Sequence, residues 1–366
     1  MNSLGFIKKP EQTRVVVAMS GGVDSSTAAA LMVESGYEVI GITLQLYDHG
    51  AAINKKGACC AGQDIYDARQ VANIIGIPHY VLDYESRFRE NVIDDFIDTY
   101  LQGETPIPCI RCNQTVKFRD LLKTARDLNA DALVTGHYVQ RIDGMSGPEL
   151  HRGRDDVKDQ SYFLFATTKE QLNFLRFPLG NMGKKETRSL AERFSLPVAK
   201  KADSQDICFV PSGSYSEVIE KFRPGSFDMG EVVDLKGQVL GHHDGIVKFT
   251  VGQRRGLGVA KGEPQYVIRI ESETSRVVIG PREALLKKQF KVKNINWLGA
   301  SEAFKIKHSV EVKIRSASTP IKAKVLIRRD YSADVFPNDP ISSVAPGQAC
   351  VFYDGRRVLG GGWIHT

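Results

Sequence analysis

The sequence has few cysteines and no long hydrophobic run. Its 366 residues include six cysteines, too few and too scattered for the disulfide framework of a secreted protein of this length. No segment approaches the roughly 18 consecutive apolar residues that a membrane-spanning helix requires, and the first residues lack the apolar core of a signal peptide. We therefore expect a soluble, cytoplasmic protein with reduced thiols and no membrane association.

The sequence also lacks a strong excess of charge of either sign. The formal net charge is +6 and the isoelectric point is near 8.9, which is compatible with a polyanionic partner but does not require one. The hydrophobic content of 42% and the charged content of 25% are typical of a globular protein, and the length suffices for two or three domains.

Apolar runs that are typical of buried strands alternate with helical patterns in the first part of the chain. This pattern predicts a doubly wound α/β domain with a parallel sheet over residues 1–210. The expected strands are residues 14–19, 38–47, 79–84 and 132–139, and the expected helices are 25–36, 62–76, 89–101, 118–129, 169–177 and 184–196. Short alternating segments with glycine-rich turns follow, and they predict a small β-rich domain over 211–285 and a C-terminal β-barrel over 286–366.

The loop SGGVDSS lies directly after the first expected strand and opens the first expected helix. Its two glycines allow a tight turn in which backbone N–H groups converge on an anion at the helix N-terminus. The lysine of a Walker A motif is missing, so the loop suits the binding of pyrophosphate as a leaving group better than transfer of the terminal phosphoryl group. The alternative is an ordinary strand-to-helix turn with a polar cap.

SGGVDSS in this position resembles the PP-loop ATP pyrophosphatases, which split ATP between its α- and β-phosphates to adenylate a substrate. Five further blocks resemble, in the same order, the tRNA 2-thiouridylase family over nearly the whole chain: TPIPCIRCN, HRGRDDVKDQSYFLF, KKADSQDICFV, FTVGQRRGLG and PGQACVFYDGRRVLGGG. The resemblance implies ATP- and Mg²⁺-dependent replacement of the C2 oxygen of the wobble uridine by sulfur in tRNAs for lysine, glutamate and glutamine. The implied sulfur donors are a cysteine desulfurase and a sulfur-relay protein.

The resemblance also implies which residues bind ATP. They are Ala18, Met19, Ser20, Gly21, Gly22, Val23, Asp24, Ser25, Leu44 and Gly136. Asp24 is a candidate ligand of Mg²⁺, with the N-cap of the helix as its alternative role. Leu44 is equally well explained as a residue of the core.

Sulfur chemistry is assigned by the resemblance to Cys112 and Cys208. Cys208 matches the cysteine that carries a persulfide, and Cys112 matches the cysteine that releases sulfide from it or resolves it as a disulfide; both roles need a thiolate. Cys109 stands where some members have aspartate. It is either a ligand of a [4Fe-4S] cluster, together with Cys112 and Cys208, or a bystander near the target base. A structural zinc site is disfavoured because no nearby fourth ligand is evident.

The remaining cysteines and the basic residues near the catalytic ones have plainer interpretations. Cys59, Cys60 and Cys350 are expected to be ordinary core residues. Three basic residues could stabilise the thiolates, lie in solvent or contact tRNA phosphates: Arg111, Lys200 and Lys201.

The resemblance implies tRNA contacts in three parts of the chain. The residues are Ile107, Pro108, Cys109, Lys158, Asp159, Gln160, Arg315 and Ser316. Arg315 matches the first arginine of a short basic element of the family, whereas Ser316 departs from that element. Arg254 and Arg255 are candidate phosphate contacts, and a generic polar loop is the alternative for Lys158 and its neighbours.

Two other functions remain as alternatives. A PP-loop ligase that adenylates a carboxylate would have no use for two separated cysteines. A protein that binds RNA without catalysis would never release pyrophosphate from ATP.

Overall fold

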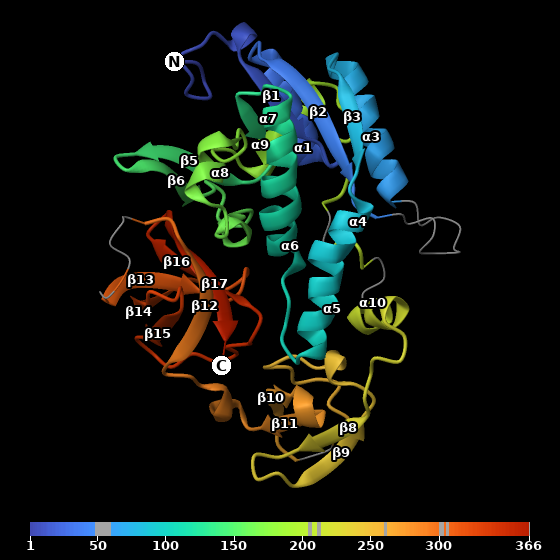
Figure 1. The fold of residues 1–366 in the computed structure, drawn as a ribbon, viewed down its shortest axis with the longest axis vertical. Helices are drawn as coiled ribbons and strands as arrows, with labels where there is room; N and C mark the ends of the chain where they lie inside the picture. The colour runs from blue at the N-terminus through green and yellow to red at the C-terminus, as the bar shows by residue number, and fades with distance from the viewer. Residues whose placement is uncertain are drawn as a thin grey trace. The chain divides into compact units, whose positions relative to one another are not determined.

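A computed structural model describes residues 1–47, 60–203, 207–210, 214–259, 262–299, 304 and 307–365 (Figure 1). The chain divides into two compact units. The first comprises Met1–Val92, Ile110–Gln205 and Arg356–Val358, and the second comprises Ile93–Cys109, Asp206–Gly355 and Leu359–Thr366. The three domain boundaries expected from the sequence stay a prediction.

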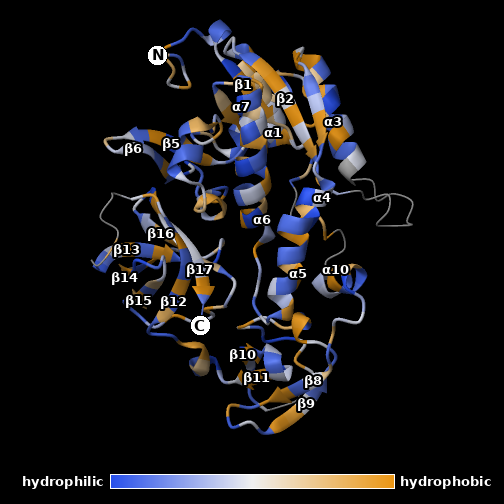
Figure 2. Cartoon of the chain, in the orientation of Figure 1, coloured by the Kyte–Doolittle hydropathy of each residue, from blue (hydrophilic) through white to orange (hydrophobic). Residues whose placement is uncertain are grey.

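The first unit contains a five-stranded parallel sheet with the order β3-β2-β1-β4-β7. The strands are β1 (Arg14–Ala18), β2 (Glu38–Gln45), β3 (His79–Asp83), β4 (Ala132–Val134) and β7 (Leu175–Arg176). Val15, Val16 and Val17 are all fully buried, as expected for a central parallel strand that is covered on both faces. Figure 2 shows β1 and β2 as strongly hydrophobic. The predicted α/β fold with a parallel sheet is confirmed.

The strand order reverses between β1 and β4, because the chain adds strands on one side of β1 first and on the other side afterwards. In open α/β sheets, ligands bind outside the carboxyl ends of the strands at such a switch point. The SGGVDSS loop follows β1, and Gly136 follows β4. The topology therefore brings both predicted nucleotide-binding segments to one edge of the sheet.

Helices lie between and after these strands in the chain. They are α1 (Val23–Glu34), α3 (Cys60–Ile75), α4 (Glu85–Phe88), α6 (Pro108–Arg111), α7 (Leu122–Asp127), α8 (Lys169–Phe174) and α9 (Lys184–Arg193). Ten residues between α6 and α7, Cys112–Leu121, form a π-helix, and five before α5 (Asp94–Leu101), Arg89–Ile93, form another. π-Helices are rare and occur often at functional sites, and the longer one begins at a predicted catalytic cysteine.

Two short segments differ from the expectation. The strand expected over 132–139 ends at Val134, and Val139 instead begins a hairpin of β5 (Val139–Gly144) and β6 (Gly147–Arg152). The helix expected over 169–177 ends at Phe174, because Leu175 and Arg176 pair with β4 as the edge strand β7. The hairpin pairs neighbouring segments of the chain, whereas β7 forms because its partner β4 lies far away in the sequence.

The second unit is rich in β-structure and includes α5 (Asp94–Leu101) and α10 (Tyr215–Phe222). A four-stranded sheet has the order β10-β11-β8-β9, from β8 (Gly230–Val233), β9 (Val239–His243), β10 (Tyr266–Glu271) and β11 (Arg276–Gly280). Six antiparallel strands form a closed barrel in the order β12-β15-β14-β13-β16-β17, because β12 also pairs with β17. They are β12 (Phe290–Trp297), β13 (Lys307–Lys313), β14 (Ile321–Ile327), β15 (Ala333–Pro337), β16 (Ala349–Asp354) and β17 (Arg357–His365).

The barrel has its own hydrophobic core. Alternate residues of its strands point inward, and Val312, Val325 and Phe352 are fully buried. The predicted C-terminal β-barrel is therefore confirmed. Within the described part of the chain, the helices are too short or too polar to cross a lipid bilayer.

Candidate active site

The SGGVDSS loop connects β1 to the N-terminus of α1 and is braced by its own hydroxyl groups. The Ser25 hydroxyl accepts a hydrogen bond from the backbone N–H of Ser20 (3.1 Å) and lies 3.2 Å from Ser20 Oγ. Gly21 has a φ of +72°, a conformation that glycine adopts without strain. The first N–H groups of a helix have no partners within the helix, so this braced loop and the start of α1 suit an anion such as a phosphate.

Asp24 lies in the first turn of α1, and its carboxylate is held by two side chains from other elements. It accepts hydrogen bonds from the Tyr138 hydroxyl (2.7 Å) and from Lys184 Nζ (2.7 and 2.8 Å). Burial, followed by the charge of Asp24, raises the pKa of Tyr138, so this hydroxyl stays protonated and donates. The N-cap residue of α1 is Gly22, and no side chain caps the helix there. The alternative role of Asp24 as the N-cap is therefore wrong.

Lys184, the first residue of α9, connects Asp24 to a second carboxylate. Its ammonium lies 2.8 Å from Asp203 Oδ1, and its side chain is only 13% exposed. Asp203 also forms ion pairs with Lys158 (2.8 Å) and Arg188 (2.9 Å). We call these five residues, Asp24, Lys158, Lys184, Arg188 and Asp203, the charge cluster. It has three cations and two carboxylates and therefore carries a net positive charge beside the SGGVDSS loop, Ser20–Ser26, which we call the phosphate loop after its predicted role.

A second lysine fastens the phosphate loop to α3. Lys201 Nζ donates to the carbonyl of Gly21 (2.9 Å), and it forms ion pairs with Asp64 (2.6 Å) and Asp67 (2.5 Å). Burial alone would lower the pKa of Lys201, but these two carboxylates raise it, so the ammonium is stable. From the sequence, Lys201 is expected to stabilise a thiolate, to lie in solvent or to contact a tRNA phosphate. In the structure its ammonium instead links the loop, at Gly21, to Asp64 and Asp67 of α3.

The other predicted nucleotide-binding residues lie where the topology requires. Gly136 approaches α1 so closely that a Cβ atom at this position would lie 2.7 Å from the carbonyl carbon of Asp24 and from the Ser25 nitrogen. Leu44 lies near the carboxyl end of β2 and is half-buried, which leaves both its nucleotide-binding and its core role open. Burial and the charge of Lys117 lower the pKa of His137 to about 3, so its imidazole is neutral near pH 7.

A divalent cation would find one suitable oxygen ligand in the Asp24 carboxylate. Mg²⁺ is commonly held by one or two carboxylates together with phosphate oxygens, and Asp24 belongs to the SGGVDSS segment, where those phosphates would bind. Among the residues that the structure describes, no group of three or more His, Cys, Asp or Glu side chains is arranged to hold a metal ion.

The cysteines differ in their surroundings. Cys112 is buried at the start of the long π-helix in the first unit, and its neighbour Asn113 is 5% exposed. Cys109 and Cys208 are exposed and belong to the second unit. Cys350 is fully buried in β16, as expected for a core residue. Cys59 and the side chain of Cys60 lie outside the described residues.

The residues expected to contact tRNA are of two kinds. Asp159 and Gln160 have structural partners: the buried Asp159 carboxylate accepts from Arg152 (3.0 Å), and Gln160 Oε1 accepts from the Tyr138 N–H (2.9 Å). Arg315 and Ser316 lie exposed after β13. Arg254 and Arg255 are exposed as well. Ile107 is half-buried, and Pro108 is buried at the start of α6.

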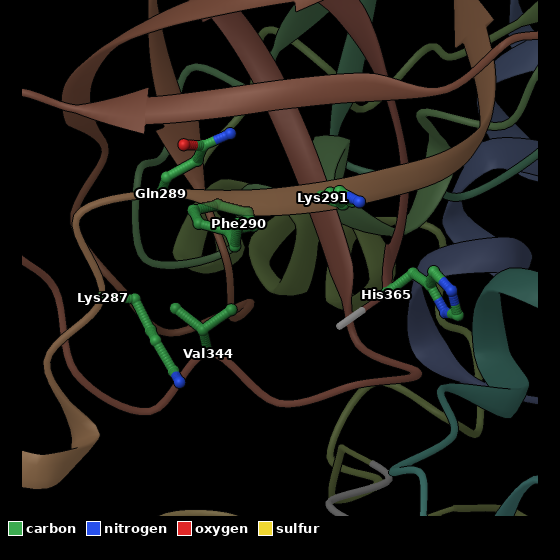
Figure 3. Close-up of a pocket in the computed structure, with 6 residues that line it drawn as sticks. All are labelled: Lys287, Gln289, Phe290, Lys291, Val344 and His365. Carbon is green, nitrogen blue, oxygen red and sulfur yellow. The ribbon is translucent and has the colours of Figure 1, made fainter.

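A cavity of about 280 Å³ lies at the barrel in the second unit (Figure 3). Its lining residues are Lys287, Gln289, Phe290, Lys291, Val344 and His365. Of the described residues that line this cavity, two are lysines and none bears a carboxylate, so this lining is positively charged. None of its residues was singled out in the sequence.

The contacts of Tyr138, Lys184 and Asp203 were not foreseen from the sequence. The block that contains Asp203 resembles the family, but the sequence gives no sign that this carboxylate shares a lysine with Asp24. The only local signal for Lys184 is its position after Gly183, at the start of an expected helix.

Known families match the chain in three consecutive parts. Residues 13–212 match a family described as the tRNA methyl transferase HUP domain, 216–281 its PRC-barrel domain, and 287–364 an aminomethyltransferase beta-barrel domain. A solved 4-thiouridine synthetase–RNA complex with bound ATP has a TM-score of 0.38 over 57% of this chain and 49% of that chain, at 15% identity, which is too slight a likeness to indicate function.

Full-length relatives give a sharper result. Proteins named tRNA-specific 2-thiouridylase MnmA from Rhodospirillum centenum, Hyphomonas neptunium and Paracoccus denitrificans are 63%, 61% and 60% identical to this chain. Each match covers 100% of this chain and 94% of the relative. The chain therefore belongs to the tRNA-specific 2-thiouridylase (MnmA) family.

Proposed function

We propose that this protein is an ATP-dependent tRNA sulfurtransferase that converts the wobble uridine of tRNA to 2-thiouridine. The observation that carries the proposal is a phosphate loop without a Walker lysine, placed at the switch point of the sheet, in a chain that matches 2-thiouridylases from end to end. The expected tRNA substrates are those for lysine, glutamate and glutamine.

The first step of the proposed reaction activates the base. The C2 oxygen of uridine attacks the α-phosphorus of ATP, the bond between that phosphorus and the bridging oxygen breaks, and pyrophosphate leaves. The braced SGGVDSS loop and the N-terminus of α1 support this step, because they offer N–H donors to phosphate oxygens. Mg²⁺, when bound at Asp24, would offset part of the phosphate charge.

The second step replaces the activated oxygen with sulfur. The Cys208 persulfide, loaded by a cysteine desulfurase through a relay protein, provides the sulfur. Cys112 attacks Cys208 Sγ and forms a disulfide with it, and the outer sulfur ends on C2 while AMP leaves. A thiol reductant then restores both cysteines. In the alternative, Cys109, Cys112 and Cys208 hold a [4Fe-4S] cluster that carries the sulfide.

The test is single-turnover thiolation of a tRNA transcript under anaerobic conditions, with 2-thiouridine measured by mass spectrometry and pyrophosphate by a coupled assay. We expect Cys112→Ser and Cys208→Ala to abolish 2-thiouridine while pyrophosphate release persists. Thiolation that survives in Cys208→Ala would refute its role as sulfur carrier. Pyrophosphate release without tRNA dependence would favour a ligase, and its complete absence in the wild type would favour an RNA-binding protein.

Cys109→Asp separates the persulfide route from the cluster route, because some relatives carry aspartate at this position. We expect both this variant and the wild type to be fully active in preparations that contain neither iron nor sulfide, as shown by assays of both. Activity that appears only after iron and sulfide are restored, and that Cys109→Asp removes, would support the cluster instead.

A further inference from the structure

We propose that Lys184 binds the phosphates of ATP and supplies the cation that the phosphate loop itself lacks. This inference rests on the proposed function. SGGVDSS contains no lysine, and in the described part of the chain Lys184 and Lys201 are the lysines hydrogen-bonded to its residues. The two differ in the charges around them, and this difference decides between them.

Lys201 is not available to a phosphate. Its ammonium protons are matched by three acceptors, which are the Gly21 carbonyl and the carboxylates of Asp64 and Asp67. With two carboxylates around one ammonium, the local charge is negative, so an approaching phosphate would be repelled. Lys201 therefore holds the backbone of the loop at Gly21 and does not bind a phosphate.

Lys184 lies in a group with the opposite balance, the charge cluster. If its ammonium moves toward a phosphate, Asp203 keeps its ion pairs with Lys158 and Arg188. Asp24 keeps the hydrogen bond from the Tyr138 hydroxyl. Neither carboxylate would be left without a partner, so the large penalty for stranding a buried charge does not arise.

The geometry also favours a short movement of the Lys184 ammonium toward bound phosphates. Lys184 Nζ lies within 2.8 Å of both carboxylate oxygens of Asp24, which belongs to the first turn of α1, and 5.8 Å from the centre of the Tyr138 ring. Lysine carries a compact charge on a flexible stem, so its ammonium can follow the phosphates while its backbone stays in α9. As the bond to pyrophosphate breaks, negative charge grows on the leaving group, and the ammonium stabilises it.

Binding of ATP and of adenosine, measured by calorimetry, tests this role without catalysis. We expect Lys184→Met to weaken ATP binding at least tenfold and to leave adenosine binding within about twofold, because adenosine has no phosphates. Lys184→Arg should restore most of the ATP affinity. The matched control is Lys185→Met, since Lys185 is the next residue of α9 and is exposed; we expect no change in this variant.

Removal of Lys184 alone leaves Asp24 and Asp203 with one cation fewer and can impair folding. The double variant Lys184→Met/Asp203→Asn avoids this excess of negative charge and is compared with Asp203→Asn, both checked by thermal unfolding. Equal ATP affinity in these two proteins would overturn the inference while the proposed function stands. A wild-type protein that binds no ATP would instead refute the proposed function.

Discussion

Asp203 shows how strongly the surroundings of one carboxylate determine its chemistry. Burial alone would raise the pKa of Asp203, but the hydrogen bonds and charges of Lys158 and Lys184 lower it to about 2. An unfolded chain would have a value near 3.9 for the same group. The folded protein therefore binds the Asp203 proton more weakly than the unfolded chain does.

This difference predicts a pH-dependent contribution to stability. Because the pKa of Asp203 is lower in the folded state, its ion pairs stabilise the protein fully above about pH 4, and the contribution disappears as the pH falls toward about 2. We expect Asp203→Asn to lower the free energy of unfolding at pH 7 and to approach the wild type at low pH. Urea denaturation across this range measures the difference.

The control for that experiment is Asp127→Asn, since Asp127 is exposed at the end of α7. We expect its difference from the wild type to be small at every pH. A difference between Asp203→Asn and the wild type that stays constant between pH 7 and pH 2.5 would show that the charge cluster does not act in this way.

At the residue scale, the sequence predicts the groups that follow a local pattern and misses those that meet across the fold. Gly21 and Gly22 belong to a recognisable turn between a strand and a helix. Tyr138 and Lys184 meet Asp24 only because the segment after β4 and the start of α9 lie beside α1, and no local pattern indicates such a contact.

At the scale of elements, the close contact between the phosphate loop and α3 allows a sharp test. A Cβ atom at Gly21 would lie 2.1 Å from the backbone oxygen of Asp64, and the φ of +72° is itself unfavourable for any other residue. We expect Gly21→Ala to destabilise the protein by roughly 2 kcal/mol or more, because strain and overpacking add. Thermal and urea unfolding measure this loss.

Gly22→Ala is the matched control for stability. A Cβ atom at Gly22 would have only Ser20 Oγ nearby, at 3.6 Å, and the backbone there is extended. We expect this neighbouring substitution to change the free energy of unfolding by less than about 1 kcal/mol. Equal stability of the two alanine variants would mean that α3 does not constrain the loop.

Long apolar elements were predictable, whereas short elements and unusual helices were not. The expected strands that match β1 and β2 bury runs of apolar residues, whereas the residues of β3 are half-buried or exposed. β7 has two residues and exists because β4 offers an unpaired edge. The sequence predicts a helix only from residue 118 onward and no π-helix, because no local pattern marks the π-helix of Cys112–Leu121.

At the scale of the whole molecule, the modest net charge of +6 leaves open where a polyanion would bind. The cavity of the barrel is lined by Lys287 and Lys291, and none of its described lining residues bears a carboxylate. We expect Lys287→Ala/Lys291→Ala to weaken tRNA binding and to reduce the slope of log affinity against log salt by about 2, because each lysine that neutralises a phosphate accounts for roughly one unit of this slope. Filter binding at several salt concentrations measures the slope.

Lys9→Ala/Lys236→Ala removes the same charge from other exposed positions and serves as the control. We expect this pair to leave the slope nearly unchanged. If both double variants reduce affinity equally, net charge alone governs the binding, and the barrel cavity has no special part in it.

The burial of Cys350 has a practical consequence for chemical labelling. Its side chain is fully buried, and burial raises the pKa of its thiol, so at neutral pH it stays protonated and reacts poorly with alkylating reagents. Cys109 and Cys208 are exposed and accessible to the same reagents. The peptide that contains Cys350 thus provides an internal unmodified reference, against which mass spectrometry of the native protein can measure how much of Cys208 carries an added sulfur.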